Sequence, residues 1–157
     1  MSERTERFKA LVSAVEIEGV RLVEANTKTE IRSAADIEAA SFHVEQSARV
    51  RERQKDGTFF VLATISAQVI PEDKDKKDEA VIAIRAGFEL QYKLPKNQVV
   101  SSRDLKTFAE TNGIYNVWPY WREFVQSTFA RMGLPPVTLP LFRVRDAIKQ
   151  AGVEKGR

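Results

Sequence analysis

The sequence predicts an α+β protein in which helices pack on a sheet of four strands. Two observations lead to this fold class. Between residues 15 and 93 apolar and polar residues alternate with a period of two, and between residues 101 and 133 apolar residues recur with a helical period. Strands therefore precede helices, which is typical of α+β proteins rather than of β-α-β repeats.

The length of 157 residues predicts a single domain spanning residues 1–157. Its expected segments are an N-terminal helix over 1–14, the sheet over 15–93, helices over 101–133, a proline-rich helix-connecting loop over 134–142, and a C-terminal helix and tail over 143–157.

The composition excludes several functional classes. The chain is 43% hydrophobic and 30% charged, and it contains no apolar run near the ~18 residues of a membrane span. The absence of cysteine excludes disulfides and zinc–thiolate sites, and it favours a cytoplasmic protein. The net charge of +3 comes from interleaved signs, so we predict no direct nucleic-acid binding and interpret the basic run Arg49–Lys55 as a solvated hairpin end.

The first helix and strand follow from local spacing. Phe8, Leu11 and Val12 recur at helical intervals, which predicts an amphipathic helix. Alternation then begins, and its phase shifts by one residue at Gly19. Such a shift indicates a bulge or bend in the first strand.

The next two strands are predicted by alternation across a turn at Asp56–Gly57. The apolar face of the second strand comprises Phe42, Val44, Ala48 and Val50. The apolar face of the third comprises Phe59, Val61, Ala63, Ile65, Ala67 and Val69.

The fourth strand follows a charged loop, Pro71–Glu79, that we expect to project into water. One face of this strand is apolar throughout, from Ala80 to Tyr92, and Val81 and Ala83 make the start of the other face apolar as well. We expect another subunit to supply part of the cover that two apolar faces require.

The helical region contains a dense aromatic cluster, "GIYNVWPYWREF", which holds both tryptophans. A capping pattern at Ser101 begins a first helix, and Gly113 suits its end. Pro119 fits the first turn of a second helix, which we expect to end at Gly133. The following "LPPVTLPLF" is too rich in proline for a helix, and it is either an internal lid or the wall of a groove.

No catalytic, metal or cofactor site is predicted. The single histidine, His43, lies on the polar face of the second strand, where a solvated imidazole is expected. The glycines are too dispersed for a phosphate-binding loop, and neither nucleotide motif is present.

Three motifs of the C-terminal half match one known family. Ala86, Phe88 and Leu90 fit a G/A-x-F-x-hydrophobic strand motif. Val117, Pro119, Tyr120, Arg122 and Glu123 fit a hydrophobic-x-PY-x-RE helix start, and a proline–leucine loop follows from Gly133 to Leu141. Over residues 80–142 the chain thus resembles the SecB family of export chaperones, and more closely the SecB-like chaperones found with toxin–antitoxin modules.

The resemblance implies a Greek-key order of four antiparallel strands and a homotetramer built as a dimer of dimers. It also implies that non-native polypeptide binds in hydrophobic grooves without nucleotide. The implied interface residues are Ala80, Ile82, Ile84, Trp121, Phe124, Val125 and Thr128. The predicted client-binding residues are Phe88, Leu90, Tyr92, Trp118, Leu134, Val137, Leu139, Leu141 and Phe142. A position in the groove and a position in the core are equally expected for Trp118, Leu134, Val137, Leu139 and Leu141.

One departure from the export chaperones concerns the partner. Those proteins are acidic and dock the SecA motor on an acidic sheet surface, whereas this chain is basic overall. The resemblance therefore leaves SecA binding open and favours a dedicated client such as an aggregation-prone antitoxin. Two other functions are kept as alternatives: a small-molecule enzyme on a curved α+β sheet, and a structural assembly module.

Overall fold

The computed structural model describes residues 2–33, 35, 40–72, 79–137 and 139. The predicted C-terminal helix and tail over 143–157 lie outside the described residues, as do the client-binding candidates Leu141 and Phe142.

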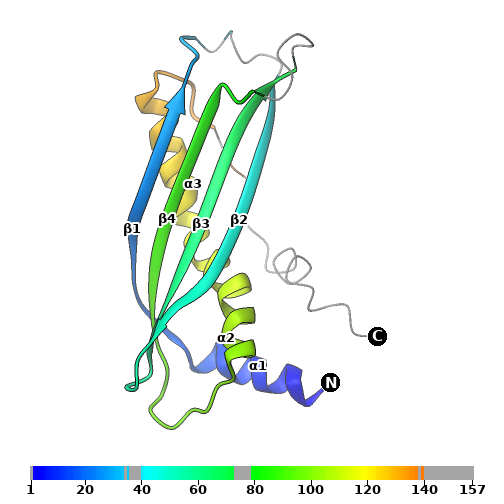
Figure 1. The fold of residues 1–157 in the computed structure, drawn as a ribbon, viewed down its shortest axis with the longest axis vertical. Coiled ribbons are helices and arrows are strands. Elements are labelled where there is room, and N and C mark those ends of the chain that lie inside the picture. Colours follow the sequence, from blue (N-terminus) through cyan, green and yellow to red (C-terminus); the bar gives the residue numbers. More distant parts are fainter. Residues whose placement is uncertain (1, 34, 36–39, 73–78, 138, 140–157) are drawn as a thin grey trace.

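The centre of the fold is one open sheet. Its strands are β1 (Glu16–Thr29), β2 (Ala40–Arg53), β3 (Thr58–Pro71) and β4 (Ile82–Lys93). Their order across the sheet is β1-β4-β3-β2, and every neighbouring pair is antiparallel (Figure 1). The predicted α+β class with four antiparallel strands is confirmed.

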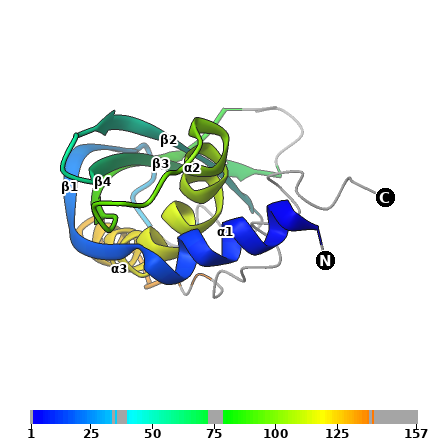
Figure 2. The ribbon, with the colours of Figure 1, turned by 90° about the horizontal axis from the view of Figure 1, so that it is seen from below.

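The helices α1 (Glu3–Ala14), α2 (Ser102–Phe108) and α3 (Ile114–Arg131) all lie on one side of the sheet (Figure 2). We call the face of the sheet toward them the inner face and the opposite face the outer face. The predicted cap of α2 is present, because the Ser101 hydroxyl oxygen accepts a hydrogen bond from the backbone N–H of Asp104 at 3.1 Å.

The predicted break between two helices at Gly113 is wrong. A π-helical turn, Ala109–Gly113, joins α2 directly to α3, and Gly113 has right-handed helical angles (φ −59°, ψ −49°). The reason for a glycine is close packing, since a Cβ at this position would lie 3.1 Å from Cγ1 of Val61 on β3.

The predicted helix start at Pro119 is also wrong, because Pro119 lies inside α3. Proline has no N–H to offer to the carbonyl of Tyr115 one turn earlier. Tyr115 is 45% exposed, so water can solvate that region of the backbone. The predicted end of the helix at Gly133 is confirmed: Gly133 has a φ of +73°, and the N–H of Leu134 bonds back to the Phe129 carbonyl at 3.0 Å.

The first strand is irregular, as the phase shift at Gly19 predicted. Its register against β4 shifts between Ile17 and Gly19, and again between Leu22 and Glu24. Glu18 and Val23 are therefore extra residues on the edge strand, which is the pattern of β-bulges.

The core lies between the inner face and the helices. The predicted apolar face of β3 is buried throughout, and so are the even-numbered residues of β4 from Ile82 to Tyr92. Phe59, Tyr92 and Phe108 form a cluster of three rings whose centroids lie 5.0–5.8 Å apart. These contacts attach α2 to the end of the sheet where β3 begins and β4 ends.

The outer face of the sheet has no helix over it among the described residues (Figure 2). Val81 and Ala83 are half-buried there. Their partial exposure leaves the predicted second apolar face of β4 without full cover within one chain.

Candidate peptide-binding surface

The aromatic cluster divides between the core and the surface. Trp121 is fully buried and Trp118 is 8% exposed, whereas Tyr115 and Tyr120 are 45% and 49% exposed. Tyr120 and the half-buried Phe124 both meet Phe88 of β4, with ring centroids 6.5 Å and 6.4 Å apart. Tyr120 and Phe124 on α3 therefore form an accessible aromatic strip at the edge of the core.

Most of the predicted client-binding residues are packing residues in a single chain. Val137 is half-buried, and the others within the described residues are buried. These buried residues are Phe88, Leu90, Tyr92, Trp118, Leu134 and Leu139.

The predicted interface residues are also mostly internal. Ala80 and Phe124 are half-buried and so remain accessible. The buried members are Ile82, Ile84, Trp121, Val125 and Thr128. The rings of Trp121 and Phe124 stack with their centroids 6.3 Å apart. The buried Trp121 is therefore in contact with the more accessible flank of α3.

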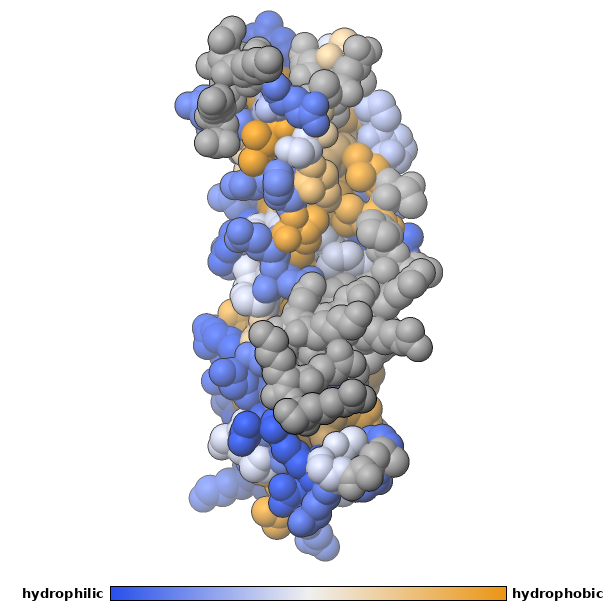
Figure 3. All heavy atoms as spheres, turned by 90° about the vertical axis from the view of Figure 1, so that its right-hand side faces the viewer, coloured by the Kyte–Doolittle hydropathy of each residue, from blue (hydrophilic) through white to orange (hydrophobic). Residues whose placement is uncertain are grey.

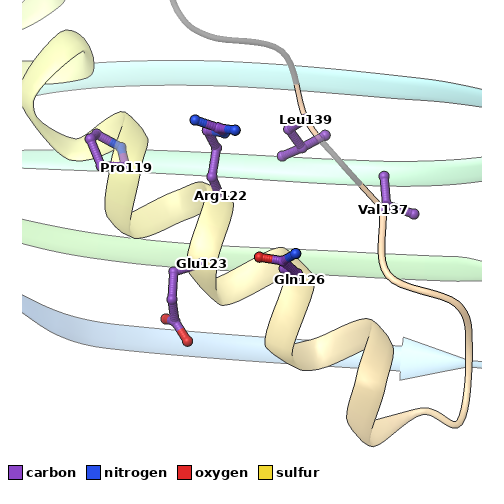
Figure 4. Close-up of a pocket in the computed structure, with 6 residues that line it drawn as sticks. All are labelled: Pro119, Arg122, Glu123, Gln126, Val137 and Leu139. Atoms are coloured by element: carbon purple, nitrogen blue, oxygen red, sulfur yellow. The ribbon is translucent and has the colours of Figure 1, made fainter.

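A groove of about 280 Å³ lies between α3 and the segment that follows it (Figure 4). Val137 and Leu139 form its apolar side. Arg122 and Gln126 extend from α3 toward them, and Glu123 points the other way. Arg122 is half-buried and forms no ion pair with the described part of the chain. The groove thus combines apolar walls with a cation and an amide.

Two exposed apolar strips on the edge strands were not among the predicted site residues. On β1, Ile17, Leu22 and Val23 are 49%, 48% and 41% exposed. On β2, Phe42 and Val44 are 36% and 38% exposed. The face of the molecule toward the β2 edge shows apolar side chains gathered in its upper half (Figure 3). The sequence shows that these residues are apolar, but only the structure shows that they stay exposed.

The polar groups near this surface are structural. The Asn116 amide donates a hydrogen bond to the Tyr92 hydroxyl at 2.9 Å, and burial raises the pKa of Tyr92 to about 12. Tyr92 therefore stays protonated at physiological pH. Within the described ranges, no group of three or more His, Asp or Glu side chains is arranged to hold a metal ion.

The outer face carries a second hollow of about 370 Å³ beside the first bulge of β1. Gly19, Arg21, Phe60, Glu89 and Gln91 contribute to its lining. Arg21 and Arg51 both bond the buried Glu89 carboxylate from opposite edges of the sheet. The hollow is thus bounded by an ion-pair network on the face opposite α3.

No described helix is both long and apolar enough to cross a membrane. No family model matches the sequence, and no curated protein matches it either.

The fold is similar to that of a SecB-like chaperone of known structure. The structure of the Mycobacterium tuberculosis Rv1957 SecB-like chaperone, in complex with a ChAD peptide from the Rv1956 HigA1 antitoxin, is similar with a TM-score of 0.74. The similarity covers 88% of this chain and 97% of that chain at 18% sequence identity. The resemblance predicted from the motifs is thus confirmed at the level of the fold. A Streptococcus agalactiae protein of unknown function is more distant, with a TM-score of 0.47 and 10% identity over 81% of this chain and 97% of that chain.

Proposed function

We propose that the protein is an ATP-independent molecular chaperone, a holdase that binds non-native or extended polypeptide. The observation that carries the proposal is the SecB-like fold combined with exposed apolar residues on both edge strands, β1 and β2. Contiguous exposed apolar surface is typical of sites that bind other proteins. We propose that the whole chain acts as one domain in this role.

The proposed client is an antitoxin. The M. tuberculosis chaperone of the same fold is bound to a peptide of an antitoxin, which supports an equivalent client here. A more general role in keeping preproteins competent for export is also compatible with the fold. The outer face intermixes basic residues such as Arg21 and Arg85 with acidic ones such as Glu24, so it lacks the uniform acidity that SecA docking would use.

The proposed assembly is a homotetramer, a dimer of dimers in the cytoplasm, with a Greek-key connection between the strands. The strand order β1-β4-β3-β2 supports the Greek-key part of this proposal. The half-exposed Tyr120 and the half-buried Phe124 support a second α3 as the neighbour, because a contact between subunits would cover both rings.

We propose that the client contacts the groove through Val137, Arg122 and Gln126, with Leu139 forming its wall. The more deeply buried candidates, such as Leu90 and Tyr92, pack in the core rather than contact the client.

A light-scattering assay of aggregation tests the proposed function. An unfolded client diluted from denaturant should stay in solution when the protein is present at equal subunit concentration, without nucleotide. Val137→Lys should raise the concentration needed for half-suppression several-fold, because a charge in an apolar groove must be desolvated when the client binds.

Val99→Lys is the matched control, since Val99 is 98% exposed and lies outside the groove. It should behave as the unmodified protein. The chaperone proposal is wrong if the unmodified protein suppresses the aggregation of neither unfolded clients nor an antitoxin at stoichiometric concentration.

A further inference from the structure

Arg122 is a half-buried cation of the groove beside α3, and no carboxylate of the described residues pairs with it. Two arginines that do pair with a carboxylate, Arg21 and Arg51, have side chains that are 72% and 51% exposed. The more exposed cations are therefore paired, whereas this less exposed one is not. A cation partly withdrawn from water is stabilised by an anion beside it.

The side of the groove formed by α3 offers mainly hydrogen-bond donors. Gln126 follows Arg122 by four residues, so the two side chains lie one turn apart on the same flank of the helix. Both extend toward the segment after α3, and Glu123 points the other way (Figure 4). A guanidinium has five N–H groups and accepts no hydrogen bond, and the amide adds two further N–H groups. This set of donors fits a carboxylate.

The opposite side of the groove is apolar. Val137 is half-buried there, and Leu139 is 5% exposed. A segment that enters the groove displaces water from between these side chains and Arg122, and the attraction between opposite charges strengthens as the local dielectric constant falls. The volume of about 280 Å³ is close to the lower end of the range for ligand pockets, so it suits a few side chains of a client rather than a folded domain.

We propose that Arg122, with Gln126 beside it, makes the groove selective for client segments that present a carboxylate next to apolar side chains. The proposal rests on the holdase function and names the chemical class of client that the groove prefers. The carboxylate comes either from an acidic side chain within the segment or from the C-terminus of the client, and both sources offer the same two oxygens to the guanidinium.

Three fluorescently labelled peptides test this selectivity on the unmodified protein. They share one short sequence of leucines and serines, with a label at the N-terminus and one variable central residue. The first has a central glutamate and an amidated C-terminus, the second a glutamine and an amidated C-terminus, and the third a glutamine and a free C-terminal carboxylate. Fluorescence anisotropy should show that the first or the third binds about tenfold more tightly than the second, as expected of a charge-assisted hydrogen bond. The peptide that binds more tightly identifies the source of the carboxylate.

A matched pair of variants assigns the preference to Arg122. Arg122→Met removes the charge and keeps an unbranched apolar side chain, so the carboxylate peptide should then bind no more tightly than the uncharged one. Arg131→Met removes the same charge from an exposed position at the end of the same helix, outside the groove, and should leave the preference unchanged. This control accounts for the general attraction of an anionic peptide to a chain of net charge +3.

Arg122→Lys is a third variant. It should keep a smaller preference than the unmodified protein, because an ammonium group lacks the planar fork that binds both carboxylate oxygens. Circular dichroism confirms that each variant is folded before its affinities are compared.

Equal affinities for the three peptides, or no binding of any of them, would overturn the selectivity. A preference that Arg122→Met keeps, or that Arg131→Met loses, would overturn it as well. Sedimentation velocity tests the competing role of Arg122, since a smaller assembly in Arg122→Met would show that its partner is a neighbouring subunit rather than a client. The aggregation assay separates these failures from failure of the holdase function. If the unmodified protein suppresses aggregation and the peptides bind equally, the chaperone function stands and the selectivity falls.

Discussion

Glu89 is a charged side chain in a buried position. It lies on the outer face of β4, yet it is 7% exposed. Arg21 from β1 donates to its Oε1 from Nε at 2.9 Å, and Arg51 from β2 donates to its Oε2 at 3.1 Å. Both edge strands are thereby linked to a central strand, and the two cations offset the cost of burying the carboxylate.

Glu89→Gln should lower the free energy of unfolding by about 1–3 kcal/mol, because the charge-assisted bonds to Arg21 and Arg51 are lost. Urea denaturation measures the change. Glu24→Gln is the control on the same face, where the Arg85–Glu24 pair is about half exposed and is expected to contribute less than about 1 kcal/mol. Equal effects of the two substitutions would contradict the structural role assigned to Glu89.

Asp56 makes the stability depend on pH in the acid range. The hydrogen bond from Lys93 and the backbone N–H of Thr58 lower its pKa from 3.8 to about 2. A carboxyl whose pKa is lowered by folding stabilises the protein fully above its unfolded pKa. This contribution should be lost as the pH falls from about 4 to about 2.

Urea midpoints measured across this pH range, for the unmodified protein and for Asp56→Asn, test the assignment. The variant should show a shallower loss of stability on acidification. Superimposable pH profiles would show that Asp56 does not carry the effect.

At the scale of elements, the continuous helix through Gly113 decides how α2 and α3 sit on the sheet. The motifs around Gly113 and Pro119 both indicated a break, because glycine and proline are the usual residues at helix ends. The structure uses the glycine for close packing on Val61 and tolerates the proline near the surface. Tertiary packing therefore overrides the local preference at both positions.

Gly113→Val should destabilise the protein by about 1–3 kcal/mol, since the added atoms enter a space already closed by Val61. A double-mutant cycle with Val61→Ala measures the coupling, and the second substitution should restore part of the loss. Strictly additive effects would indicate that the contact with Val61 is not the cause.

At the scale of the whole molecule, the aromatic cluster connects the core of one chain to the proposed assembly. Trp121 is fully buried, and its indole N–H has no hydrogen-bond partner among the described residues. Phe124 stacks on it, and Phe124 and the accessible Tyr120 both contact Phe88. Changes at Trp121 should therefore affect both folding and subunit contact.

Trp121→Ala should lower stability by about 3–5 kcal/mol through the cavity it leaves, whereas Trp121→Phe should cost less because it also removes the unpaired N–H. Thermal denaturation gives the ranking. Sedimentation velocity should show a tetramer for the unmodified protein and a shift toward smaller species for Trp121→Ala. A stable monomer that still binds client would contradict the proposed assembly.

The sequence by itself determined the α+β class, the buried faces of β3 and β4, the bulge at Gly19 and the helix end at Gly133. These features depend on spacing and capping within a few residues, so a local pattern suffices to predict them. Only the tertiary structure decided that Gly113 and Pro119 lie inside continuous helix, that Glu89 is buried between two arginines, and that Phe42 and Val44 stay accessible while Trp118 does not. Each of these outcomes depends on which distant element lies over the residue, and a pattern along the chain does not contain that information.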